Sequence, residues 1–219
     1  MVETEFAIYD LLRCRIQRGF SNSEGVCVAW VGSTRAENHR RLVRAISVEA
    51  AHLPSLRTIA SNDQAVPDTE RVIVLHMWPG GSGAALKEWP TKRWLAVTNA
   101  IISKGYHLAL TGSPEQHSLN ETFMSSLHQG VRGFVTNMAG VGLADTARIL
   151  SRASLDVSVN TGVMHVAAAA GVPLVALHGL TNAARWGPIS DRAISIESSL
   201  SGCGYLNLGF EYLRNEPPA

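Results

Sequence analysis

The sequence predicts an α/β protein built on a Rossmann-like parallel sheet, and three observations support this. From Arg71 onward, short apolar runs of strand length alternate with stretches of helical spacing. The strand runs are almost continuously apolar, which is typical of a parallel sheet with helices on both faces. Three of the runs end in polar, glycine-containing loops, and parallel sheets bind ligands beyond the carboxyl ends of their strands.

The expected elements follow one another in a regular order. The first strand is VIVLH at 72–76, and a loop leads from it to a helix over about 91–103. Further strands are expected at 106–112, 131–137, 155–159 and 173–179, with helices at about 115–127, 143–153 and 163–170. The segment RAISI at 192–196 is a candidate for a sixth strand. This succession predicts β-α units and a parallel sheet with both faces covered.

The chain changes character near residue 70, which suggests three parts. Residues 1–70 are expected to form a mainly helical or irregular N-terminal segment that ends in a polar, proline-containing linker. Residues 71–200 are expected to form the Rossmann-like domain, and residues 201–219 a C-terminal tail.

Composition narrows the classes of function. The chain has 219 residues, 46% hydrophobic and 17% charged, which favours a soluble globular protein over a disordered one. The formal net charge is only +1, so the overall charge of the chain does not favour binding to nucleic acid. The sequence shows neither a bilayer-spanning apolar run nor a signal peptide, and its three cysteines fit no disulfide framework. A cytoplasmic protein is therefore expected. No metal site is expected, because the sequence contains no acidic cluster that could hold a metal ion.

Polar loops with glycine follow three of the predicted strands, at 79–83, 111–115 and 160–162. In a parallel sheet these loops share one edge, where glycines let backbone amides approach a ligand and helix N-termini favour anions. Lys87, at the end of the first loop, could add a cation for a phosphate. The alternative is that the loops contain glycine and small polar residues only because turns need them.

Individual polar residues allow two interpretations. His165 lies one helical turn after Thr161, so it either faces a ligand or packs partly buried against the sheet. Asn160 is expected to cap the helix that follows it. Three aspartates without a partner in the sequence are expected to cap helices or face solvent: Asp68, Asp145 and Asp156.

Three segments together resemble a known family. They are LKEWPTKRW, LALTGSPEQ, and the long stretch from Met138 to Pro188 that contains VNTGVMHVAAAAGVP and GLTNAARWGP. In this order and spacing, over about residues 72–190, they resemble the C-terminal half of the family 9 glycosyltransferases, the ADP-heptose:lipopolysaccharide heptosyltransferases and their relatives. The resemblance implies the GT-B architecture, in which two Rossmann-like halves enclose the active site and the C-terminal half binds the nucleotide-sugar donor.

The resemblance also implies a role for particular residues in donor binding. Ser82 and Lys87 would contact the diphosphate, and Thr111, Gly112 and Glu115 would lie near the nucleoside. Ala139 and Gly140 would lie near the base. The phosphates and the sugar would be faced by Asn160, Thr161 and Gly162, with His165 close by.

Two departures from the family pattern affect the expected function. The family's N-terminal half holds the acceptor and supplies the expected catalytic base; residues 1–70 are too short for it, so no catalytic residue is assigned. The family's Asp-Thr-Gly turn is Asn-Thr-Gly here, with Asn160 uncharged.

The expected function is that of a glycosyltransferase-like protein that binds a nucleotide-diphosphate sugar, with ADP-heptose as a candidate, for transfer to a glycan or lipopolysaccharide acceptor. No cofactor and no nucleic-acid partner are expected, and the location would be the cytoplasm, peripheral to the inner membrane. The alternatives are a non-catalytic nucleotide-sugar-binding module, or the donor half of a split enzyme whose acceptor-binding half is a separate chain.

Overall fold

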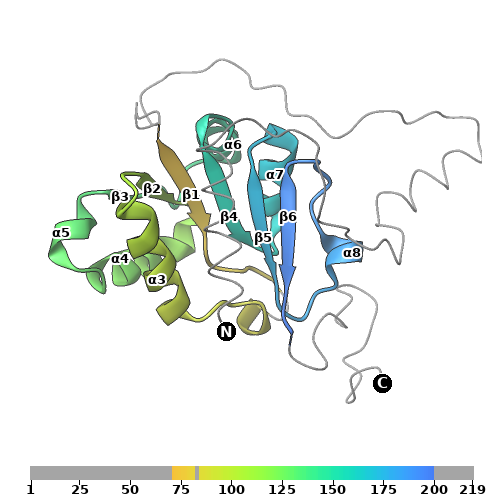
Figure 1. The fold of residues 1–219 in the computed structure, drawn as a ribbon, viewed down its shortest axis with the longest axis horizontal. Helices are drawn as coiled ribbons and strands as arrows, with labels where there is room; N and C mark the ends of the chain where they lie inside the picture. Colours follow the sequence, from red (N-terminus) through yellow and green to blue (C-terminus); the bar gives the residue numbers. More distant parts are fainter. Residues whose placement is uncertain (1–70, 82–83, 200–219) are drawn as a thin grey trace, which may run out of the picture.

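A computed structural model describes residues 71–81 and 84–199 of the chain. Within them, six parallel strands form one sheet in the order β3-β2-β1-β4-β5-β6 (Figure 1). The strands are β1 (Val72–His76), β2 (His107–Leu110), β3 (Val135–Asn137), β4 (Leu155–Val159), β5 (Leu174–His178) and β6 (Ala193–Glu197). The predicted α/β fold and its sixth strand are confirmed, whereas the predictions for 1–70 and 201–219 fall outside the described residues.

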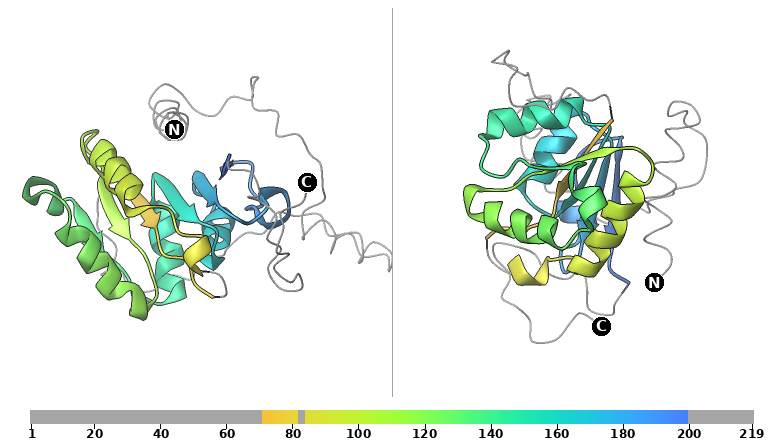
Figure 2. Two further views of the ribbon diagram at one scale, coloured as in Figure 1. Left: turned by 90° about the horizontal axis from the view of Figure 1, so that it is seen from below. Right: turned by 90° about the vertical axis from the view of Figure 1, so that its left-hand side faces the viewer.

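Helices flank the twisted sheet, as the views in Figure 2 show. The longer ones are α3 (Thr91–Ile102), α4 (His117–Ser125), α6 (Leu143–Arg152) and α7 (Gly162–Ala170). Shorter pieces complete the connections: η2 (Ala84–Leu86), η3 (Pro114–Gln116), α5 (Gln129–Arg132) and α8 (Ala183–Trp186).

Two apolar cores form because side chains alternate between the two faces of each strand. On one face, Ile73 and Leu75 of β1 pack with Trp94 of α3, which is fully buried. On the other face, Val74 packs in a cluster with Met164 of α7. Both faces of the central strands are therefore covered, and this explains why their sequences are mainly apolar.

Helix α7 lies directly behind the turn that follows β4. It begins at Gly162 and ends at Gly171, whose φ of 73° is left-handed and therefore suits glycine. Its small residues Ala167 and Ala168 are buried against the sheet, so the helix axis can approach the strands closely. The N-terminus of α7 is thereby fixed at the carboxyl edge of the sheet.

The predicted strand at 131–137 is too long. Only Val135–Asn137 form β3, while Val131 and Arg132 belong to the short helix α5. The His128 side chain accepts a hydrogen bond from the Gly130 amide and so starts a helical turn there. A capping interaction between neighbouring residues therefore overrides the strand preference of this segment.

Asp156 neither caps a helix nor faces solvent, so that prediction is wrong. It lies fully buried on β4, between Val74 of β1 and Leu174 of β5. Both of these neighbours belong to the core cluster on the α7 face. Neither carboxyl oxygen has a hydrogen-bond partner among the described residues. Asp68 lies outside them.

Candidate functional site

The strand order reverses at β1, which marks one place on the carboxyl edge of the sheet. The chain runs from β1 outward to β2 and β3, and then returns to place β4 on the other side of β1. In doubly wound sheets, ligands bind outside the carboxyl ends of the strands at such a reversal. The predicted sharing of one edge by the loops after β1, β2 and β4 is confirmed, because all the strands run parallel (Figure 1).

His76 and Thr111 join the tips of β1 and β2. The His76 Nδ1 atom lies 3.1 Å from Thr111 Oγ1, and the Thr111 amide donates to the Leu75 carbonyl at 3.1 Å. Burial lowers the pKa of His76 to about 4, so the ring is neutral at pH 7. His76 thus offers the site a neutral imidazole, which the sequence analysis did not single out.

Lys87 is folded back onto its own loop. Its Nζ atom donates to the Gly80 carbonyl at 2.8 Å, only 7% of the residue is exposed, and desolvation lowers its pKa. An ammonium group has three N–H donors, so two remain for an anion. Ser82, the other predicted diphosphate contact, lies outside the described residues.

The first loop also reaches the end of β5. A Cβ atom added at Gly179 would lie 3.2 Å from the carbonyl oxygen of Leu86, in the η2 turn just before Lys87. The approach is close because Gly179 has no side chain. Lys87 is therefore brought toward the tips of β4 and β5, where the Asn-Thr-Gly turn lies.

The loops after β2 and β3 contact each other through their glycines. The Gly140 amide donates to the Gly112 carbonyl at 2.9 Å, and the φ of Gly140 is 92°. A Cβ atom at Gly112 would lie 3.3 Å from that of Ala139. The structure therefore brings together Gly112, Ala139 and Gly140, as a shared nucleoside surface requires.

Glu115 extends from the same loop into solvent. It lies in η3, where Ser113 and Gln116 form a capping box. A hydrogen bond from the Ser113 side chain lowers the pKa of Glu115, so the exposed carboxylate is charged at pH 7.

A buried asparagine that sequence reasoning missed holds these loops together. Asn120 is fully buried in α4, and its Oδ1 atom accepts from Trp78 Nε1 at 2.7 Å. Its Nδ2 atom donates to the Leu110 carbonyl at 3.3 Å and to Asn137 Oδ1 at 2.9 Å. Gln116 adds a second link, from Nε2 to the Trp78 carbonyl at 3.1 Å. The only signal in the sequence is a polar residue on the apolar face of a helix.

The turn after β4 has an unexpected partner at the end of β5. The Asn160 side chain contacts His178 and Thr181, and all three residues are buried. Asn160 does not cap α7, because the N-cap residue is Thr161. His178 and Thr181 were not predicted as site residues; their signal was a histidine at the end of an apolar strand, followed by a polar turn.

Thr161, Gly162 and His165 lie where the sequence placed them, at the start of α7. The Thr161 hydroxyl is buried without a hydrogen-bond partner among the described residues, while Gly162 and His165 are exposed. Burial, and to a smaller extent the charge of nearby His165, lowers the pKa of His178 to about 4. His178 is thus linked to this turn by its contact with Asn160, and His165 lies close enough to affect its pKa.

Within residues 71–81 and 84–199, no group of three or more His, Cys, Asp or Glu side chains is arranged to hold a metal ion. None of the helices described there is long and apolar enough to cross a membrane.

Residues 47–204 match the family model of glycosyltransferase family 9 (heptosyltransferase). Among curated proteins, lipooligosaccharide heptosyltransferase 2 of Haemophilus influenzae is 31% identical over 124 residues, which is 56% of this chain and 36% of that protein. The chain spans about a third of the length of the curated relatives that it matches most significantly.

Solved structures show the same fold. The structure of the Escherichia coli ADP-heptose lipopolysaccharide heptosyltransferase II has a TM-score of 0.61 at 25% identity, with 69% of this chain and 48% of that chain covered. A family 9 glycosyltransferase from Veillonella parvula has a TM-score of 0.64 at 21% identity, with 85% and 54% covered.

Proposed function

Because the chain belongs to glycosyltransferase family 9, we propose that its Rossmann-like domain binds a nucleotide-diphosphate sugar, with ADP-heptose as the expected donor. The observation that carries the proposal is the meeting of the loops after β1, β2 and β4 at one edge, beside a buried lysine and the N-terminus of α7. The acceptor would be a lipopolysaccharide or a related glycan, since the relatives carry that name. The reaction would then take place at the cytoplasmic side of the inner membrane.

The chemistry of these residues suits a diphosphate leaving group. When the bond to the sugar breaks, negative charge develops on the diphosphate, and fixed N–H donors and cations stabilise it. Lys87 supplies the cation, and the first amides of α7 supply N–H donors with the positive end of the helix dipole. The contacting loops of Gly112 and Gly140 would receive the nucleoside.

A second candidate is a module that binds the donor without transferring it. Asn160 favours it, because the family pattern has a carboxylate at this position and an amide cannot take over its charge. Turnover of ADP-heptose with a lipopolysaccharide acceptor, by this chain or with a separate acceptor-binding chain, would support the transferase. Binding without turnover in both assays would support the module.

Replacing Lys87 with alanine is expected to weaken the binding of ADP by about 1–3 kcal/mol, since a hydrogen bond to a charged group is lost. Isothermal titration calorimetry of the purified chain measures this effect. Lys92→Ala is the matched control, because Lys92 is exposed in the first turn of α3.

ADP should also shift the backbone amide NMR signals of Gly81, Gly112 and Gly162 together, because their loops share one edge. Shifts confined to a single loop, or equal ADP affinity for Lys87→Ala and Lys92→Ala, would contradict the proposed site.

A further inference from the structure

Asn160, His178 and Thr181 form a buried hydrogen-bonded triangle at the ends of β4 and β5. The Asn160 Nδ2 atom donates to Thr181 Oγ1 at 2.7 Å and lies 3.2 Å from His178 Nδ1. Thr181 Oγ1 lies 3.1 Å from the same ring nitrogen. The exposed fractions of the three residues are 6%, 3% and 0%, so bulk water does not compete for these bonds.

The donors and acceptors in this triangle fix the position of the imidazole proton. An amide nitrogen only donates, so it can approach His178 Nδ1 only if that atom carries a lone pair. The Thr181 hydroxyl accepts the short bond from Asn160, and its own proton is then available for the same ring nitrogen. A neutral imidazole whose Nδ1 accepts carries its proton on Nε2.

We infer that Asn160 is a positioning residue that acts through His178: it holds the ring neutral with the proton on Nε2, so that β5 adds a hydrogen-bond donor and no charge to the edge where the diphosphate is proposed to bind. The His178 Nε2 atom is buried without a partner among the described residues, which leaves this donor unused in the chain itself. The role of His178 in binding the nucleotide sugar rests on the proposed function, whereas the inferred tautomer of His178 does not depend on it.

An aspartate at position 160 would reverse this arrangement. A carboxylate only accepts, so it would accept one hydrogen bond from His178 Nδ1–H and another from the Thr181 hydroxyl. When neutral, the ring would then present a lone pair at Nε2, and the adjacent negative charge would favour the imidazolium. The residue at position 160 therefore determines whether His178 Nε2 donates or accepts, and a carboxylate there would oppose the effect of burial on the charge of the ring.

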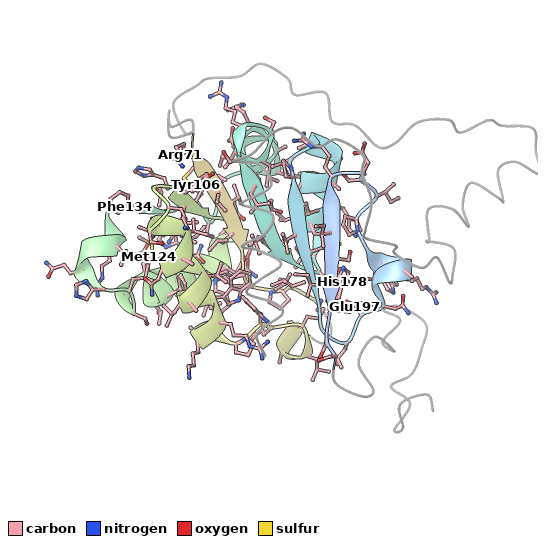
Figure 3. The ribbon with its side chains drawn as sticks, viewed as in Figure 1. Arg71, Tyr106, Met124, Phe134, His178 and Glu197 are labelled. Carbon is pink, nitrogen blue, oxygen red and sulfur yellow. The ribbon has the colours of Figure 1, made fainter. Side chains whose placement is uncertain are left out.

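Two titratable residues neighbour His178 on other elements. His165 of α7 disfavours the imidazolium by its own charge. Glu197 is the strand partner of His178 on β6, and the two residues lie together at one end of the sheet (Figure 3). The Glu197 carboxylate is engaged by the Ala183 amide at 2.8 Å. Burial remains the main reason why the pKa of His178 is low.

Long-range proton–nitrogen NMR spectra of the ¹⁵N-labelled, ligand-free chain at pH 7 test the inference, with the His178 signals assigned by their loss in His178→Gln. The wild type is expected to show the Nε2–H tautomer. Asn160→Asp is expected to move the proton to Nδ1 and to raise the pKa of His178 by roughly 1–3 units. Asn182→Asp is the matched control, because it adds the same charge next to Thr181 while keeping the cap that Asn182 provides for α8.

An Nδ1–H tautomer in the wild type would overturn the inference, and this result does not depend on the folding of Asn160→Asp. Equal effects of Asn160→Asp and Asn182→Asp on the His178 ring would overturn it as well. If ADP shifts the amides of Gly112 and Gly162 but leaves the His178 ring signals unchanged, the role in the site fails while the proposed function stands. If no ADP binds, the proposed function fails, and the ligand-free spectra still decide the tautomer.

Discussion

Asn120→Ala is expected to lower the free energy of unfolding by about 2–4 kcal/mol. Asn120 is fully buried, and the substitution deprives the Trp78 indole N–H of its acceptor and the Leu110 carbonyl of a donor. Leaving the Trp78 N–H unsatisfied costs about 1–3 kcal/mol. The Leu110 carbonyl keeps the Met138 amide as a donor, so its lost hydrogen bond adds about 0.5–1.5 kcal/mol. Urea unfolding followed by circular dichroism measures the loss.

Asn99→Ala serves as the control, because Asn99 is exposed on α3 and a surface substitution of this kind changes stability by less than about 0.5 kcal/mol. The Asn120 variant should also bind ADP more weakly, since Trp78 and Asn137 anchor the loops after β1 and β3. Equal unfolding midpoints for the two variants would mean that the Asn120 hydrogen bonds do not hold these loops.

The fold could be predicted because its signal is local and repeated. The central strands are mainly apolar runs of strand length, and burial on both of their faces favours a sheet between helices. Strand β4 departs from this pattern, because it also buries Asp156 and Ser158. Another exception is β3, an edge strand of only three residues. Its short apolar stretch is no stronger a signal than the helical turn that the His128 side chain starts beside it.

The candidate site could be predicted only in part. The loops could be located, because the carboxyl ends of parallel strands must share an edge. The hydrogen-bond partners of the loop side chains could not be predicted, because these partners come from distant parts of the sequence. Asn160 illustrates this: by sequence it looks like a helix cap, but its amide bonds to residues 18 and 21 positions later. Asn120 and Trp78 are separated by 42 positions.

The buried carboxyl of Asp156 should make the stability of this protein depend on pH in an unusual direction. Burial without a hydrogen-bond partner raises the pKa of Asp156 well above its ordinary value of 3.8. The folded state therefore binds the proton more tightly than the unfolded state does. The stability associated with this group is complete below the unfolded pKa and is lost as the pH rises toward the folded pKa, by about 1.4 kcal/mol per pH unit.

Asp156→Asn is expected to remove this loss, because an amide does not titrate. His76 and His178 act in the opposite direction, since their lowered pKa values favour folding at higher pH and cost stability below about 6.5. They are present in both proteins, so the difference in unfolding free energy between wild type and variant isolates Asp156. That difference should shift in favour of the variant by more than about 1 kcal/mol for each unit from pH 5 upward, until the folded pKa is reached.

Asp191→Asn is the control, because Asp191 is exposed, and this variant should follow the wild-type curve at every pH. Parallel curves for wild type and Asp156→Asn would show that the Asp156 carboxyl is ionised in the folded protein, and that the α7 face of the sheet tolerates a charge.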